Sequence, residues 1–413
     1  MSERAFDLVL FGATGFTGRL VAEYLVKQGA AAKGADGGPL RWALAGRDAR
    51  KLEDVRRTIG APELPILTAD ATDPNALGAL AGKTRVVCTT VGPYAQYGKW
   101  LVGACAENGT DYCDLTGETQ FVRAMIDAHH ARAEQTAARI VHCCGFDSIP
   151  SDLGVLLLAE HFKSHGHSLR RAKFLLGRTS GGMSGGTTAS MLNLMDEASH
   201  DRELRRLLAD PYALVPDRAR DRGPDGPDAM GVAYDDDAAA WTGPFVMAAI
   251  NTRVVRRSNA LLGFAYGRDF RYEEVTGFPG TPRGLAMATG MTAGIGGFMA
   301  LAITAPTRKL LGRVLPKPGE GPSKETRERG YFEVRILGWG DGDARPSAEA
   351  LIEGRADPGY GETAKMLGES ALELVGTHRA RARGGVLTPA SALGVPLIER
   401  LRRAGMRFDV RAR

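Results

Sequence analysis

Gly12-Ala13-Thr14-Gly15-Phe16-Thr17-Gly18 is the stretch that decides the fold of this chain. It follows the short apolar run 6–11, which reads as a buried strand, and leads into residues 20–25, whose apolar positions recur at helical spacing. In a strand–turn–helix unit of this kind, Gly12 permits the tight turn, Gly15 lets the backbone approach a pyrophosphate, and Gly18 lets the helix pack closely on the strand. The alternative is a tight turn in another kind of α/β protein. We predict a dinucleotide site formed by Gly12, Thr14, Gly15, Phe16, Thr17 and Gly18.

The end of the second strand indicates which dinucleotide is bound. The apolar segment 40–45 should form this strand, and NAD-binding proteins usually carry an Asp or Glu at its end for the ribose hydroxyls. Here the chain continues as Gly46-Arg47, and Arg50 and Lys51 follow on the next turn. A cation at a helix start is electrostatically unfavourable unless an anion lies nearby. We therefore predict NADP, with Arg47 paired to its 2′-phosphate; the alternative is an ordinary basic first turn of a surface helix.

Further apolar runs predict a doubly wound parallel sheet of about six strands. They lie at 64–69, 84–91, 111–115 and 139–144, with helical patterns between most of them. Ligands of such sheets lie at the carboxyl ends of the strands. The loops there place Asp70 toward the adenine amino group, and Val91 and Gly92 along the nicotinamide ribose. We expect four polar residues to face the nicotinamide or the substrate, with helix capping or turn formation as the alternative: Tyr94, Glu118, Asp147 and Ser148.

Composition bounds the class of protein. The 413 residues suggest two or three domains, and 44% hydrophobic with 24% charged residues is typical of globular proteins. The excess of Lys and Arg over Asp and Glu is small and spread along the chain, so a nucleic-acid partner is not predicted. The five cysteines lack C-x-x-C spacing, so neither a metal site nor a disulfide framework is predicted. The first ten residues do not resemble a secretory signal, and we expect a cytoplasmic location.

The expected chemistry is hydride transfer. None of the ten tyrosines has a lysine four residues later, so the Tyr-x-x-x-Lys pair of short-chain reductases is missing. If the reaction is enoyl reduction, hydride goes to the β-carbon, and a donor must stabilise the developing enolate and protonate the α-carbon. The sequence does not rank the candidates for this donor, which are Tyr94, Tyr97, Asp147 and Ser148.

The segment Gly284–Thr307 carries no charged residue over 24 positions. This length could span a bilayer, but five glycines dilute its hydrophobicity. Three interpretations stay open: a transmembrane helix, a buried or subunit-packing helix, and an element that lies on a membrane or lines the entrance for a lipid substrate. The third is favoured by the basic residues that follow, Arg308, Lys309, Arg313 and Lys317.

The middle of the chain carries two weaker signals. The Gly-Ser-rich run 181–187 precedes a helical pattern and offers backbone donors to an anion or a carbonyl group, or it is a plain connection. Arg253 follows an apolar run and could meet a thioester or a phosphopantetheine-bearing partner, with a surface salt bridge as the favoured alternative.

Several motifs taken together resemble those of the saccharopine dehydrogenase-like family. Besides the glycine turn, they are Ala45-Gly46-Arg47, Val91-Gly92-Pro93-Tyr94, Tyr112-Cys113-Asp114-Leu115-Thr116-Gly117-Glu118 and 144–152. The segments 181–187, 357–366 and 385–390 extend the match over nearly the whole chain and look like the branch of mycobacterial trans-acting enoyl reductases.

The resemblance implies an α/β architecture of three parts: a Rossmann domain over 1–150, a central α+β substrate or dimerisation domain over 151–356, and a C-terminal helical segment over 357–413 that returns to the first domain. It also implies NADPH-dependent reduction of a carbon–carbon double bond in a polyketide or fatty-acyl-type chain, in trans to a synthase or carrier protein. Two alternatives stay open, because a shared fold does not fix the substrate. They are an oxidoreductase of amino-acid imines and a non-catalytic NADP-binding protein of lipid surfaces.

Overall fold

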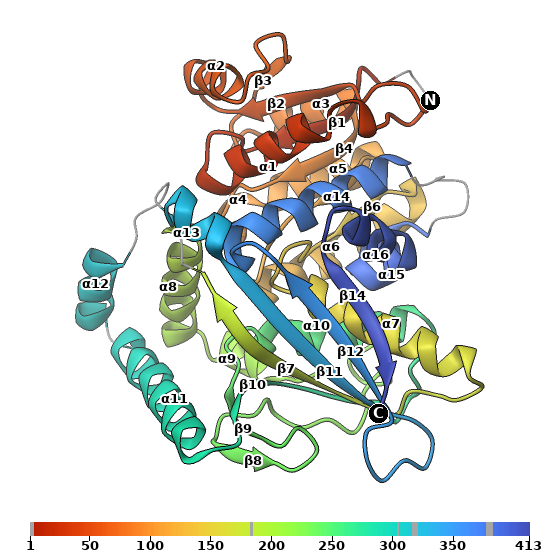
Figure 1. The fold of residues 1–413 in the computed structure, drawn as a ribbon. Coiled ribbons are helices and arrows are strands. Elements are labelled where there is room, and N and C mark those ends of the chain that lie inside the picture. The colour runs from red at the N-terminus through yellow and green to blue at the C-terminus, as the bar shows by residue number, and fades with distance from the viewer. Residues whose placement is uncertain (1–3, 182–184, 304, 316–320, 377–382) are drawn as a thin grey trace. The chain divides into compact units, whose positions relative to one another are not determined.

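The computed structural model describes residues 4–181, 185–303, 305–315, 321–376 and 383–413 (Figure 1). The chain divides into two compact units, each with its own sheet. Unit 1 holds Met1–Asp147, Gly319–Gly321 and Gly359–Ala404, and unit 2 holds Ser148–Pro318, Pro322–Pro358 and Gly405–Arg413.

Unit 1 is built on a seven-stranded sheet in the order β13-β6-β5-β4-β1-β2-β3. Every described pair in it is parallel. The central strand β1 is a continuous apolar run whose Leu8, Val9 and Leu10 are fully buried, as expected for a parallel strand covered on both faces. The predicted Rossmann sheet is confirmed. Its strands are β1 (Phe6–Phe11), β2 (Trp42–Gly46), β3 (Ile66–Thr68), β4 (Thr84–Thr89), β5 (Asp111–Cys113), β6 (Arg139–Val141) and β13 (Gly385–Leu387).

The helices of unit 1 come from both ends of the chain. Buried Arg139 of β6 pairs with Asp111 of β5 and donates to the carbonyl of Leu374, which fixes a C-terminal helix on the sheet. The helices are α1 (Phe16–Gln28), α2 (Ala49–Thr58), α3 (Pro74–Lys83), α4 (Tyr94–Tyr97), α5 (Lys99–Asn108), α6 (Thr119–Thr136), α14 (Thr363–Gly376), α15 (Pro389–Ala392) and α16 (Gly394–Arg403).

Unit 2 is built on a mixed seven-stranded sheet in the order β14-β12-β11-β7-β10-β9-β8. Only the described pair β7–β10 is parallel. Gly154 brings α7 close to this sheet, because a Cβ at this position would meet Ile336 Cδ1 at 2.5 Å. The strands are β7 (Arg171–Ser180), β8 (Ala233–Asp235), β9 (Ala240–Pro244), β10 (Arg271–Pro279), β11 (Tyr331–Trp339), β12 (Ala348–Gly354) and β14 (Arg407–Ala412).

One helix of unit 2, α11, is unusually exposed to solvent. Helix α11 is long and apolar enough to cross a membrane by length and composition alone, yet only 11% of its most apolar window is buried. The interpretation of this segment as a helix buried in the core of this chain is therefore wrong, whereas its packing against another subunit stays a prediction. The helices are α7 (Ile149–Ser164), α8 (Gly185–His200), α9 (Arg202–Ala209), α10 (Ala248–Leu261), α11 (Pro282–Ile303), α12 (Ala305–Val314) and α13 (Lys324–Arg329).

The last part of the chain is divided between the two units. Gly359–Ala404 belong to unit 1, whereas Gly405–Arg413 belong to unit 2, where β14 pairs antiparallel with β12. The sequence signal for this strand is the alternation around Phe408, which is fully buried between exposed Arg407 and Asp409. The C-terminal range is therefore not helical throughout.

Candidate functional site

The glycine turn between β1 and α1 has the geometry of a phosphate cradle. Gly12 has a φ of 92°, which favours glycine, and a Cβ there would lie 2.6 Å from Val91 Cγ2. At Gly18 a Cβ would lie 2.2 Å from the carbonyl oxygen of Gly12. Gly15 is exposed and caps α1 without any side-chain hydrogen bond, and no acidic residue occupies the first turn. The helix therefore presents backbone N–H groups to an anion, and the residues present fit a dinucleotide pyrophosphate.

The other residues predicted in this turn surround the cradle. Thr14, Phe16 and Thr17 are half-buried. The ring of Phe16 packs edge-on against that of Tyr360, with 5.2 Å between their centroids. The Thr90 hydroxyl donates to the Gly12 carbonyl oxygen at 3.2 Å, and so ties the end of β4 to the turn. Val91, which is half-buried, and Gly92, which is exposed, follow at once, so the structure brings the predicted ribose segment next to the predicted phosphate cradle.

At the end of β2, the acid nearest to the expected ribose position is already engaged. Arg47 is exposed directly after the strand. The side chain of Asp48 accepts from the backbone N–H of Lys51 at 3.1 Å and so caps α2. The cap engages Asp48, so it is not a ready ribose ligand, and the pairing of Arg47 with a 2′-phosphate stays a prediction.

Asp70 follows β3 and forms a local turn. Its Oδ1 accepts from the backbone N–H of Thr72 at 2.8 Å and from the Thr72 hydroxyl at 2.6 Å. These hydrogen bonds, and to a smaller extent the positive charge of Arg47, lower the pKa of Asp70. Asp70 is thus a carboxylate at neutral pH near Arg47, and its contact with adenine stays a prediction.

Tyr94 is a core residue at the carboxyl edge of unit 1. Its hydroxyl donates to the carbonyl of Thr89 at 3.2 Å, and burial raises its pKa well above the usual value. Glu118 is also buried and accepts from the backbone N–H groups of Tyr94 and Ala95 at 2.8 and 2.9 Å, so it caps α4. Tyr97, by contrast, is 38% exposed. Glu118 therefore acts as a helix cap, which was the alternative to its facing the nicotinamide or the substrate. The catalytic role of Tyr94 stays a prediction.

A buried Asp–His pair, which the sequence analysis did not single out, organises the loop after β6. Asp114 Oδ2 lies 2.7 Å from Nδ1 of His142 and accepts from the Tyr112 hydroxyl at 2.8 Å. Its Oδ1 accepts from the backbone N–H groups of Thr116 and Cys143, both at 3.1 Å. Cys143 has a φ of 63°, a conformation that costs energy in a non-glycine residue and persists where surrounding bonds hold it.

This loop carries Asp147 at the carboxyl edge of the sheet. The backbone N–H of Phe146 donates to the Thr363 hydroxyl at 3.0 Å, which anchors the loop a second time. Asp147 is half-buried, and burial, aided by the negative charge of Asp114, raises its pKa to about 7. A carboxyl group with such a pKa can hold a proton at neutral pH and give it up in a reaction.

Ser148 belongs to unit 2 and lies in a buried polar network. Its hydroxyl donates to Asn251 Oδ1 at 2.9 Å, and the Asn251 amide donates to Glu274 Oε2 at 2.9 Å. The Tyr272 hydroxyl donates to the other carboxylate oxygen of Glu274 at 2.6 Å. Burial raises the pKa of Glu274 to about 7. Because the Ser148 proton is engaged by Asn251, the structure accounts for this serine within unit 2, and its catalytic role stays a prediction.

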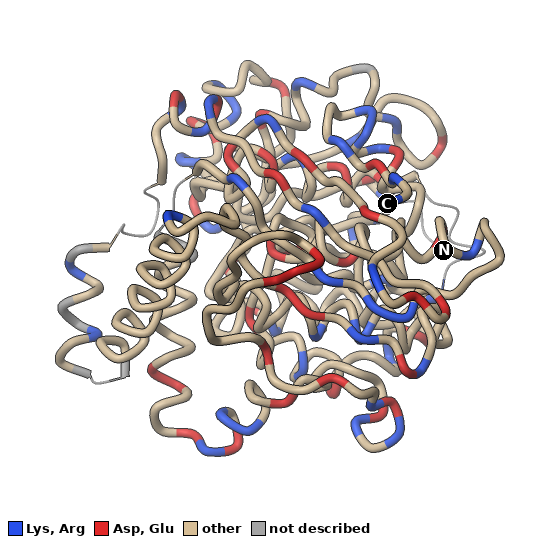
Figure 2. The backbone as a smooth tube through the Cα atoms, turned by 60° about the horizontal axis from the view of Figure 1, so that its bottom comes forward, with Lys and Arg blue, Asp and Glu red and all other residues tan. Residues whose placement is uncertain are grey.

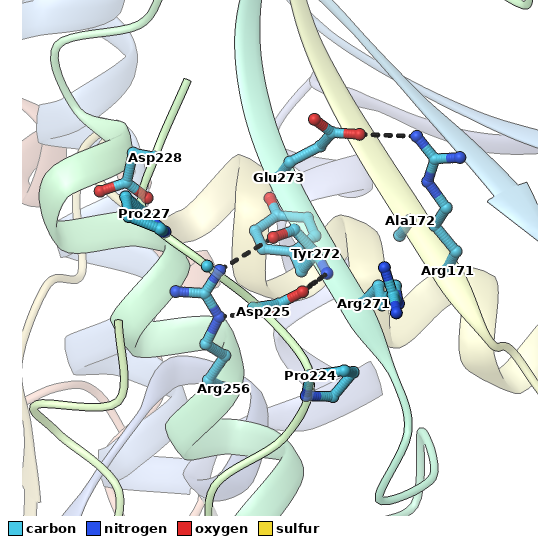
Figure 3. Close-up of a pocket in the computed structure, with 11 residues that line it drawn as sticks. Arg171, Ala172, Pro224, Asp225, Pro227, Asp228, Arg256, Arg271, Tyr272 and Glu273 are labelled. Atoms are coloured by element: carbon cyan, nitrogen blue, oxygen red, sulfur yellow. Dashed lines mark hydrogen bonds and ion pairs between the residues drawn. The ribbon is translucent and has the colours of Figure 1, made fainter. Parts of the chain in front are cut away.

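A polar pocket of about 310 Å³ opens in unit 2 between β7, β10 and the loop 224–228 (Figure 3). Arg171 and Arg256 line it, and they pair with Glu273 and Asp225 at 2.7 Å each. Arg253 lies nearby on α10, is 2% exposed, pairs with Asp228 and donates to the Leu208 carbonyl at 3.1 Å. Arg253 therefore forms a salt bridge, as the alternative predicted, but this salt bridge is buried and not at the surface. The Gly-Ser-rich run 181–187 lies in part outside the described residues.

Comparisons with known proteins agree with this geometry. Residues 8–141 match the family model of the saccharopine dehydrogenase NADP binding domain. The chain is similar in fold to saccharopine dehydrogenase (L-Glu forming) from Saccharomyces cerevisiae, with a TM-score of 0.52 and 12% identity over 99% of this chain and 100% of that one. Fold and glycine turn together define an NADP-binding oxidoreductase of the saccharopine dehydrogenase class.

The sequence relatives are closer. The chain is 46% identical, over 98% of its length and 97% of the other, to a protein of Mycobacterium tuberculosis (strain ATCC 25618 / H37Rv) that is provisionally named a trans-acting enoyl reductase. It is 42% identical, over the same shares of both chains, to the trans-acting enoyl reductases of Mycobacterium bovis (strain BCG / Pasteur 1173P2) and Mycobacterium leprae (strain TN). The chain belongs to the family of the trans-acting enoyl reductases.

Proposed function

We propose that the protein is an NADPH-dependent reductase of carbon–carbon double bonds in polyketide or fatty-acyl-type thioesters. The observation that carries the proposal is the phosphate cradle at Gly12–Gly18 in a chain 42–46% identical, over nearly its full length, to proteins named trans-acting enoyl reductases. A trans-acting reductase acts on a substrate held by another protein, so the chain would receive its substrate from a separate polyketide synthase or carrier protein. We also propose a cytoplasmic location, peripheral to the membrane, which suits such substrates, and a homodimer as the assembly.

Each predicted cofactor residue has a role in this proposal. The backbone around Gly12, Gly15 and the start of α1 would hold the pyrophosphate, and Arg47 would hold the 2′-phosphate. Asp70 would accept from the adenine amino group. NADPH bound in this way supplies the hydride. Thr14, Phe16, Thr17, Gly18, Val91 and Gly92 complete the proposed binding surface.

Asp147 is the proton donor that we propose. When hydride adds to the β-carbon, the electron pair of the double bond moves toward the α-carbon and the thioester carbonyl. The Asp147 carboxylic acid then gives its proton to the α-carbon and becomes a carboxylate. Burial keeps a large share of this group protonated at neutral pH, because it raises the pKa to about 7.

Tyr94 and Ser148 are better placed to hold the site than to transfer protons. Their hydroxyl hydrogens are directed to the Thr89 carbonyl and to Asn251. The Asp114–His142 pair holds the loop after β6 in place, and in this way it positions Asp147, which lies on the same loop.

The first test is NADPH oxidation on addition of a long-chain enoyl thioester to the purified protein. Oxidation supports the reductase. Oxidation with an amino-acid imine instead would favour the second function, which the saccharopine dehydrogenase fold suggests. Tight NADPH binding without turnover of either substrate would favour the non-catalytic alternative.

Replacing Arg47 with Ala should weaken NADPH binding by about 10- to 100-fold and leave NADH binding almost unchanged. The expected loss is that of one charge-assisted hydrogen bond to the 2′-phosphate. Calorimetric titration with both dinucleotides measures it. The matched control is Arg57→Ala, which changes an exposed arginine of the following helix α2 whose charge pairs with Asp54, and this variant should bind both dinucleotides normally. An equal loss for NADPH and NADH would contradict the assignment.

A further inference from the structure

Helix α11 shows an apolar surface to solvent over most of its circumference. A narrow stripe that includes Gly284, Ala288 and Ala302 is buried. This side of the helix meets β9, where a Cβ on Gly243 would lie 3.2 Å from Met291 Cε. On the remaining surface, four large apolar side chains are 38–48% exposed: Leu285, Met287, Met299 and Leu301. Soluble proteins rarely leave such a continuous apolar surface uncovered.

The charged residues that flank α11 in the sequence are all of one sign, although in space Asp196 of neighbouring α8 pairs with Arg308 of α12. In the sequence no Asp or Glu occurs between Glu274 and Glu320. Arg283 at the start of α11 and Arg313 near the end of α12 are both exposed. In Figure 2, α11 is drawn tan after its first residues, without a red or blue position. An apolar strip with one exposed cation at its start and another on the helix that follows matches a lipid bilayer, which is apolar inside and can carry negatively charged headgroups at its surface.

Aromatic residues also lie at the N-terminal end of the helix. Tyr234 is 45% exposed and packs edge-on against Trp241 of β9, with 5.2 Å between ring centroids. Its hydroxyl oxygen lies 3.2 Å from where Gly280 would carry a Cβ, two residues before α11 begins. Tyr and Trp side chains of this kind are favoured at the boundary between lipid tails and headgroups.

From these observations we infer that the exposed face of α11 docks on the surface of an anionic phospholipid bilayer. The helix lies flat on the membrane and does not cross it, since its buried stripe is attached to β9 and β10 of unit 2. A protein partner fits less well. Protein interfaces carry about one hydrogen bond per 100–200 Å², and the exposed side chains of this helix beyond Arg283 are Ala, Leu, Met and a single Thr.

The inference extends the peripheral position proposed above, but it does not depend on the reaction. Its test measures binding of the full chain to vesicles, so that a failure here leaves the reductase proposal standing. Conversely, loss of the reductase proposal would leave the docking surface standing.

The experiment is co-sedimentation with vesicles of phosphatidylcholine alone and of phosphatidylcholine with phosphatidylglycerol. We expect the wild type to bind the anionic vesicles at least about tenfold more strongly than the neutral ones. The double variant M287E/L301E should lose at least about tenfold in partitioning to the anionic vesicles. R283E/R313E should lose the preference for anionic lipid and keep the weak neutral binding.

The controls separate docking from misfolding and from self-association. Val395→Glu changes an apolar residue of unit 1 that is 41% exposed and should bind vesicles like the wild type. NADPH titration shows that each variant is folded. The inference is overturned if wild type binds neither vesicle, or if M287E/L301E binds as well as wild type. It is also overturned if light scattering shows a stable dimer that M287E/L301E splits while vesicle binding is absent, because a second copy then covers α11.

Discussion

Replacing Asp147 with Asn should lower kcat for enoyl-thioester reduction by about 10²- to 10⁴-fold, the range that a positioned general acid contributes. The amide keeps the size of the carboxyl group but supplies no acidic proton for the α-carbon. NADPH binding should stay within about twofold of wild type, because no cofactor contact is assigned to this side chain. Stopped-flow NADPH oxidation and calorimetric titration measure the two quantities on the same preparation.

The matched control for this variant is Asp127→Asn. Asp127 lies on α6 of the same unit, with a side chain that is 66% exposed and pairs with Arg123 of the same helix. The Asp127→Asn variant should reduce the enoyl thioester with the kcat of the wild type. If Asp147→Asn kept more than about a tenth of wild-type activity, another group, such as exposed Tyr97, would have to be the donor.

The pH dependence gives a second measure of the same residue. Burial disfavours the carboxylate of Asp147 and raises its pKa from 3.8 to about 7. Because the protonated acid is the active form, kcat/KM should be constant below about pH 7 and fall about tenfold per pH unit above it. Asp147→Asn should show a low rate without this falling limb. A limb that persists in the variant would belong to another titrating group.

Local signals in the sequence were enough to predict the Rossmann sheet and the cofactor cradle. The run 6–11, the glycines that follow and the helical pattern lie within about 20 residues, so strand, turn and helix are specified without distant partners. The residues after β2 could be interpreted in the same way. An acid there indicates NAD and a cation indicates NADP, so the prediction of the cofactor depends on one or two positions.

The environment of the proposed proton donor could not be predicted in this way. Asp114 and His142 are 28 positions apart and meet only because β5 and β6 are neighbours in the sheet. Ser148 and Asn251 are 103 positions apart and face each other from the residue before α7 and from α10. The strand β13 has three residues, too few for a periodic pattern, and its place beside β6 depends on the return of the chain. Tertiary packing decides each of these features.

The largest loss of cofactor binding should follow from Gly18→Ala. A Cβ at this position would lie 2.2 Å from the carbonyl oxygen of Gly12 and 2.9 Å from Cα of Ala13. Both are backbone atoms, so no side-chain rotation relieves the clash. The first turn of α1 must move away from β1, which displaces the N–H groups that face the pyrophosphate. We expect NADPH affinity to fall at least about 100-fold, together with about 1–3 kcal/mol of stability from overpacking.

Gly78→Ala is the control that isolates this mechanism. Gly78 lies in the interior of α3 in the same unit, and a Cβ there would meet nothing within 4 Å. Alanine is favoured over glycine in a helix interior by about 1 kcal/mol, so this variant should melt at a slightly higher temperature and bind NADPH normally. Calorimetric titration and thermal unfolding of both variants make the comparison. If Gly18→Ala bound NADPH like Gly78→Ala, the cofactor could not depend on close packing of α1 against β1, and the cradle would have to be placed elsewhere.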